Sequence, residues 1–140
     1  MILSSSVSRL ARWWMPDGAP LLIDEVRLAT LAGEVGQSLP AIMEAFRDEV
    51  RDRIIAMRQR LQRNDRRALT IEAHSIKGTA SAMGLVKLSL EAKALEDGVE
   101  RMSSEEIALQ LRAIQSAFYD SCSALVVLRH LPALTKDDGP

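Results

Sequence analysis

The chain has 140 residues, of which 47% are hydrophobic and 26% are charged, and its formal net charge is −1. This length suits one domain, and the apolar fraction favours a packed core over a disordered chain. The near-neutral charge does not favour a nucleic-acid-binding protein, which is usually basic on one face. The single cysteine, Cys122, excludes an internal disulfide and fits a reducing compartment.

Membrane and leader segments are not expected either. The chain starts Met-Ile-Leu-Ser-Ser-Ser and lacks the charged-then-apolar order of a signal peptide. No run approaches the roughly 18 apolar residues that a membrane span needs. Aromatic residues make up only 4% of the chain, and no alternation of β-branched residues predicts strands. We therefore expect an all-helical cytoplasmic protein.

Residues 1–20 are expected to form a short helix and a linker. The apolar residues of this segment share one helical face: Leu3, Val7, Leu10, Ala11 and Trp14. A run rich in Pro and Gly follows, from Met15 to Pro20. One ring of the Trp13–Trp14 pair is expected to pack on the rest of the domain, and a docking or dimer contact is the alternative.

Two helices are predicted next. The first starts near Asp24, a good N-cap residue, and ends near Gly33. The second runs from about Leu39 to Arg63, with Ser38 as its cap and Pro40 tolerated in the first turn. Its apolar residues recur at helical spacing: Leu39, Ile42 or Met43, Phe46, Val50, Ile54, Met57 and Leu61.

Three further helices follow Asn64 and Asp65, which are predicted to form a turn and a helix cap. The first has a buried stripe made of Leu69, Ala73, Ile76, Ala80 and Met83. Gly84 breaks it, and the apolar residues of the next helix are Leu85, Leu88, Ala92, Leu95 and Val99. The last helix begins at a capping box formed by Ser103 and Glu106 and runs to about His130. Its inward residues are Ile107, Leu111, Ile114, Phe118, Leu125 and Leu128.

Four long amphipathic helices with short connections predict an all-α fold. The expected architecture is an antiparallel four-helix bundle with one or two extra N-terminal helices. We expect residues 1–20 to form the N-terminal helix and linker, residues 21–132 the bundle, and residues 133–140 a flexible tail.

Several kinds of reactive site are disfavoured by the residues present. Cys122 falls on the inner side of the last helix, which suits a core residue better than a nucleophile. The chain has no second cysteine and no His-x-x-x-His pair, so a metal site is not expected. No phosphate-binding loop occurs. We therefore expect no ATP-dependent enzyme, no metal and no cofactor in this chain.

The candidate that remains is His74, which lies more than about 90° from the centre of the buried stripe and faces outward. A neutral imidazole has a free lone pair and can accept and release a phosphoryl group. Lys77, one turn along, would balance the phosphoryl charge, and Gly78 removes a side chain that would obstruct an incoming protein. If the two helices pack antiparallel around Gly84, Glu96 lies at the height of His74 and accepts a hydrogen bond from its second ring nitrogen.

Each of these residues also has a plainer interpretation. An exposed histidine on a helix is usually ordinary surface, and Lys77 and Lys93 are compatible with solvated lysines. Gly78 in the middle of a helix costs about 1 kcal/mol relative to Ala, and close helix packing is the alternative reason for it. Possible auxiliary residues of the site are Lys93, Ser81 and Thr70.

The central run resembles the signature of histidine-containing phosphotransfer (HPt) domains: His74-Ser75-Ile76-Lys77-Gly78, small residues up to Gly84, and Leu95-Glu96 on the next helix. It is also similar to the phosphorylated domain of chemotaxis histidine kinases. The resemblance extends more weakly over about residues 24–131. It implies that His74 is phosphorylated, Lys77 contacts the phosphoryl group, Gly78 admits the partner and Glu96 orients the imidazole. Family members often have Gln at the place of Glu96.

The resemblance implies a phosphocarrier of a two-component phosphorelay rather than an enzyme. His74 would accept a phosphoryl group from a receiver-domain aspartate and pass it to another receiver, with a hybrid or other histidine kinase as a further partner. Mg²⁺ is expected on the receiver. The partner surface is expected to include Ile71, Ala82 and Leu85. We expect a monomer that binds neither nucleic acid nor membrane.

Two alternatives stay open at this point. The chain is compatible with a helical adaptor, or a degenerate HPt module, that binds partners without being phosphorylated. It is also compatible with the phosphorylated domain of a kinase that is assembled from separate chains.

Overall fold

The computed structural model describes residues 21–128 and 130 of the chain. The helix and linker expected over residues 1–20 and the tail expected over residues 133–140 lie outside these described residues. The described elements are all helical: α2 (Glu25–Val35), η1 (Gly36–Ser38), α3 (Leu39–Gln62), α4 (Arg66–Ala82), α5 (Val86–Gly98) and α6 (Ser104–Val127).

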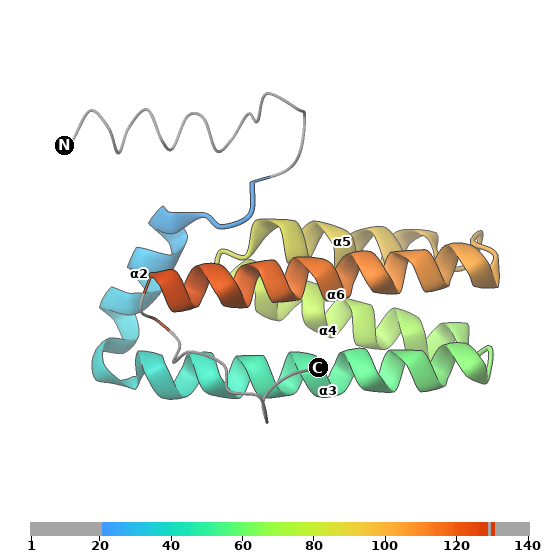
Figure 1. The fold of residues 1–140 in the computed structure, drawn as a ribbon, viewed down its shortest axis with the longest axis horizontal. Coiled ribbons are helices and arrows are strands. Elements are labelled where there is room, and N and C mark those ends of the chain that lie inside the picture. Colours follow the sequence, from blue (N-terminus) through green and yellow to red (C-terminus); the bar gives the residue numbers. More distant parts are fainter. Residues whose placement is uncertain (1–20, 129, 131–140) are drawn as a thin grey trace.

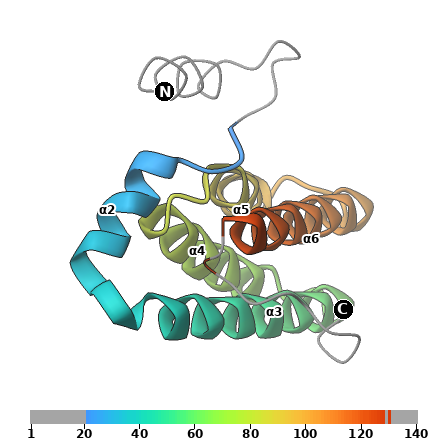
Figure 2. The same ribbon diagram turned by 60° about the vertical axis from the view of Figure 1, so that its left-hand side comes forward.

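The four long helices form an antiparallel bundle (Figure 1). Helix α3 packs against α4 and α6, and α5 packs against the same two helices. The α4–α5 seam and the α3–α6 seam therefore lie on opposite sides of the bundle, as the oblique view shows (Figure 2). Helix α2 crosses one end of the bundle. The prediction of an all-α four-helix bundle with an extra N-terminal helix is confirmed.

Three helix starts are capped as the sequence predicts. The Asp24 carboxylate accepts the backbone N–H groups of Val26 and Arg27, both at 3.1 Å, and Asp65 accepts that of Ala68 at 3.0 Å. At α6, the Ser103 hydroxyl and the Glu106 carboxylate form the reciprocal capping box. These side chains satisfy backbone donors that have no partner within the helix.

Several predicted helix ends differ from the structure. Helix α2 continues through Gly33 to Val35, because the left-handed residue that ends it is Gly36, with φ of 56°. The 3₁₀ turn η1 follows directly, so Ser38 is already in a helical conformation and makes no capping bond to α3. Helix α6 ends at Val127, short of His130.

The bundle core is built from the predicted stripes of all four long helices. All of the residues assigned to them are buried except Leu128 and the partly buried Ile42 and Leu61, and these last two still pack against the core. Cys122 is buried, as expected for a core residue. The prediction that Leu128 faces inward is wrong. Leu128 lies beyond the end of α6 and is 38% exposed.

The relative height of α4 and α5 is set at both of their ends. Between them, Gly84 adopts a φ of 76° and its carbonyl accepts the Asp24 N–H at 2.7 Å. At the far end, the Arg66 guanidinium of α4 donates to the carbonyls of Val99 and Met102 at 2.5 and 2.6 Å, which holds the α5–α6 connection. The seam between α4 and α5 is therefore held in one register.

Candidate functional site

His74 lies on the outer side of α4, with 66% of its side chain exposed. Its Nδ1 atom is 2.5 Å from Oε2 of Glu96 on α5. His74 is ten residues before Gly84 and Glu96 is twelve after it, so the antiparallel pair brings them to one height, as the spacing predicts. One ring nitrogen is thus engaged, on a ring that remains open to solvent.

Glu96 also binds the lysine of the site. The Lys77 ammonium donates to Oε1 of Glu96 at 2.7 Å, so one carboxylate holds both groups. The Glu96 side chain is only 17% exposed. The hydrogen bond from Lys77, more than any other interaction, holds the pKa of Glu96 below its ordinary value of 4.5; the bond with His74 acts in the same direction and burial opposes both. The carboxylate is therefore ionised near neutral pH.

The surface beside Lys77 is open at Gly78. A Cβ atom built on Gly78 meets no heavy atom within 4 Å, and the residue is exposed. Close packing of a neighbouring helix, the plainer interpretation of this glycine, is therefore not its reason. The bare backbone faces solvent on the helix that carries His74, where an approaching protein would gain room.

The three auxiliary candidates are not drawn into the contact between His74, Glu96 and Lys77. The Lys93 ammonium lies 2.5 Å from the Asp97 carboxylate, an exposed pair one turn apart on α5. The Thr70 hydroxyl donates to the carbonyl of Arg66 within its own helix. Ser81 is exposed and lies two turns along α4 from His74.

The apolar surface near His74 differs in part from the prediction. Ile71 is 57% exposed and Ala82 is exposed, as expected of a partner surface. The prediction that Leu85 belongs to the partner surface is wrong. Leu85 is fully buried, because it belongs to the apolar stripe of α5 that packs into the core. Leu90 on α5, which the sequence analysis missed, is 45% exposed. Its exposure could have been predicted from the sequence, because Leu90 lies outside the buried stripe formed by Leu88, Ala92 and Leu95.

A groove of about 490 Å³ continues the α4–α5 seam toward α2. Ser81 and Ala82 from α4 and Ser89 and Leu90 from α5 line it, with Arg27 of α2 at its end. Ser89 lies two turns before Glu96, so the groove lies on the His74 side of the seam. Its walls combine small, polar and apolar side chains.

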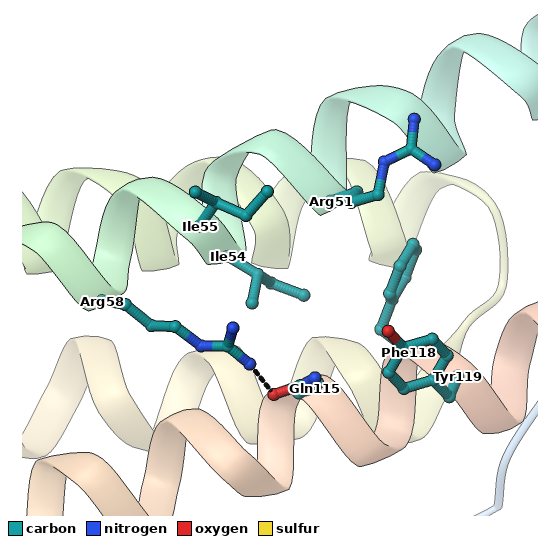
Figure 3. A pocket seen from close by; sticks show the side chains of 7 residues that line it. All are labelled: Arg51, Ile54, Ile55, Arg58, Gln115, Phe118 and Tyr119. Carbon is teal, nitrogen blue, oxygen red and sulfur yellow. Dashed lines mark hydrogen bonds between the residues drawn. The ribbon is translucent and has the colours of Figure 1, made fainter. Parts of the chain in front are cut away.

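A second depression, of about 120 Å³, lies between α3 and α6 on the opposite side of the bundle. Figure 3 shows Arg58 reaching from α3 to Gln115 of α6, and the apolar side chains of Ile54 and Phe118 line the same hollow. None of its lining residues belongs to α4 or α5. This pocket is therefore separate from the histidine site.

Neither a metal site nor a membrane helix is found in the part of the chain that the structure describes. No group of three His, Cys, Asp or Glu residues there is arranged to hold a metal ion. Over the same residues, no helix combines the length and the apolar character needed to cross a membrane.

Comparison with known proteins identifies the family. The Hpt domain model matches residues 41–126, which include all four residues of the site. The chain belongs to the Hpt domain family. The crystal structure of histidine-containing phosphotransfer protein B (HptB) from Pseudomonas aeruginosa PAO1 matches with a TM-score of 0.71 and 26% sequence identity, covering 77% of this chain and 94% of that one. No curated protein sequence matches the chain.

Membership of the Hpt domain family confirms the resemblance on which the sequence analysis relied. It supports a histidine phosphotransfer role in a phosphorelay. The match covers the bundle from early α3 to the last turn of α6 and leaves out α2 and the residues before it.

Proposed function

We propose that this Hpt protein carries a phosphoryl group on His74 between two receiver domains. The observation that carries the proposal is the imidazole itself, 66% exposed and held through Nδ1 by Glu96 at 2.5 Å. A ring that is fixed at one nitrogen and open at the other is suited to attack by the free nitrogen. The chain would act as a phosphocarrier in the cytoplasm rather than as an enzyme.

The hydrogen bond selects the attacking atom. When Nδ1–H donates to the Glu96 carboxylate, the lone pair of the neutral ring is on Nε2. Nε2 attacks the phosphorus of the receiver's aspartyl phosphate, the P–O bond to the aspartate breaks, and that carboxylate remains on the receiver. The phosphorylated ring keeps its Nδ1 proton and is positively charged. The anionic Glu96 stabilises this charge, so no separate base is needed.

Lys77 and Gly78 complete the proposed site. The Lys77 ammonium is tied to Glu96 and 30% exposed, one turn from His74, so a short side-chain movement would bring it to a phosphoryl oxygen. Gly78 would let the receiver approach closely, with Ile71, Ala82 and Leu90 as its surrounding surface. Ser81 would contact the partner rather than the ring, and no part in the transfer is assigned to Lys93, which is paired with Asp97.

The proposed exchange needs a divalent ion, which we expect the receiver rather than this chain to bind. Phosphoryl transfer requires neutralisation of the oxygens of the transferred group. We expect Mg²⁺ to be held at the receiver's aspartate, while Lys77 supplies the positive charge from the Hpt side. Transfer to a second receiver is the same step in reverse, with that receiver's aspartate as nucleophile.

The test compares the chain's two histidines. The purified protein is incubated with a receiver phosphorylated on its aspartate, and the transferred phosphate is examined for the stability of phosphohistidine, which is labile in acid and stable in alkali. His74→Gln should accept no phosphate. His130→Gln, a matched control located beyond α6, should accept it as the wild type does.

The other interpretations predict different results. An adaptor or degenerate Hpt module would accept no phosphate from any receiver while still binding one. A kinase domain assembled from separate chains would be phosphorylated on His74 by a kinase and ATP but not by a phosphorylated receiver. A profile against all receivers of the source organism distinguishes these outcomes from transfer between receivers.

A further inference from the structure

An apolar groove lies at the end of the bundle where the described chain begins. It has a volume of about 410 Å³, and its walls come from the segment before α2 and from the end of α6: Leu21, Leu22, Ile23, Glu25, Ala124, Val127 and Leu128. Val127 is 79% exposed and Leu128 is 38% exposed. Large aliphatic side chains gathered around a hollow suggest a surface that is covered in solution.

The segment that precedes Leu21 matches this groove in chemistry. Its predicted helix has one apolar face, formed by Leu3, Val7, Leu10 and Trp14. The residues after α6 match less well, because their short run ends in Lys136-Asp137-Asp138-Gly139-Pro140.

The chain also brings this segment to the right place. Leu21 lines the groove, so the segment starts at the groove wall. Six residues, Met15 to Pro20, separate Trp14 from Leu21, and an extended linker of that length spans about 20 Å. Trp14 therefore has enough reach to enter the hollow between Leu22 and Val127.

We propose that this groove is the docking site of the chain's own N-terminal segment, residues 3–14, with Trp14 inserted between the pre-α2 segment and the end of α6. The docked helix covers Val127 and Leu128 and braces residues 21–24. This short stretch is hydrogen-bonded to the α4–α5 region through Leu22 with Lys87 and Asp24 with Gly84. Docking is thus linked to the turn that sets the height of His74 against Glu96, but it does not depend on the proposed function.

Tryptophan fluorescence tests the proposal in the full-length protein, because both of the chain's tryptophans are in this segment. In Trp13→Phe, Trp14 is the only reporter, and it should be less accessible to acrylamide in the folded protein than in denaturant. In Trp14→Phe, Trp13 should be more accessible, since it lies about 100° around the helix from the apolar face.

Substitutions on α6 then locate the shielded ring. In the Trp13→Phe background, Val127→Asp should raise the quenching of Trp14 toward the denatured value and shift its emission to longer wavelength. Leu109→Asp is the matched control, because Leu109 is 61% exposed on the same helix and outside the groove. It should leave the fluorescence unchanged. Circular dichroism checks that both variants keep their helices.

Three outcomes would overturn the proposal. The first is a Trp14 that is quenched in the folded protein as readily as in denaturant. The second is a shielded Trp14 that does not respond to Val127→Asp, which would place it elsewhere on the bundle. The third is shielding that disappears on dilution, which would identify a second copy of the chain as the occupant.

Discussion

The Glu96 carboxylate lies 2.5 Å from Nδ1 of His74 with one oxygen and 2.7 Å from Nζ of Lys77 with the other. The histidine and the lysine are therefore coupled through one anion on the neighbouring helix. In the unphosphorylated protein, the Glu96 carboxylate binds the Lys77 ammonium, which is the group that we expect to contact the phosphoryl group. Phosphorylation would have to draw Lys77 from Glu96 toward the new charge while the imidazole stays bound.

Substitutions of Glu96 separate orientation from charge. Glu96→Gln keeps an oxygen that can accept the Nδ1 hydrogen, so we expect phosphotransfer within a few-fold of wild type. Glu96→Ala removes the acceptor, and a hydrogen bond to a charged group contributes about 1.5–3 kcal/mol, so transfer should slow by about tenfold or more. Rapid-quench measurement of phosphate transfer from a receiver checks both. Equal rates for the two variants would show that Glu96 does not orient the ring.

Replacing Lys77 tests the proposed phosphoryl contact. Lys77→Ala should slow transfer to His74 by about tenfold, the size expected for loss of one charge-assisted contact. Lys93→Ala is the matched control, because Lys93 is on the neighbouring helix and paired with Asp97. It should retain a rate near that of the wild type. A similar loss in both variants would point to general electrostatic attraction of the partner instead.

At Gly78, we expect a small side chain to be compatible with folding and a large side chain to impair phosphotransfer. A Cβ here enters open space, so Gly78→Ala should raise the free energy of unfolding by roughly 0.5–1 kcal/mol. Gly78→Leu should leave the protein folded and sharply slow transfer from the receiver, because the side chain occupies the approach surface.

The matched control is Gly33→Leu, a second exposed helical glycine with open space around it. It should fold and transfer phosphate normally. Thermal unfolding and the transfer assay are run on all three variants. Normal transfer by Gly78→Leu would contradict the role assigned to this glycine.

Gly84 should be sensitive to the smallest substitution. Its φ of 76° disfavours any side chain, and a Cβ would lie 2.8 Å from the Asp24 carbonyl oxygen. We expect Gly84→Ala to lower the free energy of unfolding by at least about 1–2 kcal/mol, measured by urea denaturation. This is the opposite sign to Gly78→Ala. Unchanged stability would mean that the α4–α5 turn adapts without its contact to the start of α2.

The lowered pKa of Glu96 predicts how its contribution to stability depends on pH. Since the folded-state pKa is below the ordinary 4.5, the contribution is present above that value and is lost as the pH falls through the folded-state pKa. The stability difference between wild type and Glu96→Gln should therefore shrink as the pH falls below the ordinary value of 4.5. Urea denaturation at each pH measures it. Glu44→Gln, exposed on α3, is the control, and a difference that persists at the lower pH would contradict the prediction.

Most of the fold could be predicted because its signals are local. Apolar spacing identified the buried faces of α3 to α6, and Asp24, Asp65 and Ser103 marked the starts of α2, α4 and α6. The errors came where two local signals competed. Gly33 looked like a helix end, but the backbone conformation that ends α2 is adopted by Gly36. Leu85 looked like surface near the histidine, although its spacing also placed it in the stripe of α5, and packing into the core prevailed.

By itself, the sequence determined that this is a helical bundle with an outward-facing His74, because helical periodicity assigns each side chain to a face without reference to any other helix. It also placed Lys77 and Gly78 on the same helix. Only the tertiary structure decided that Glu96 binds His74 and Lys77 together and that aliphatic side chains surround a groove at the end of the bundle. Distances between helices depend on how their core faces interlock, and no spacing within one helix contains that information.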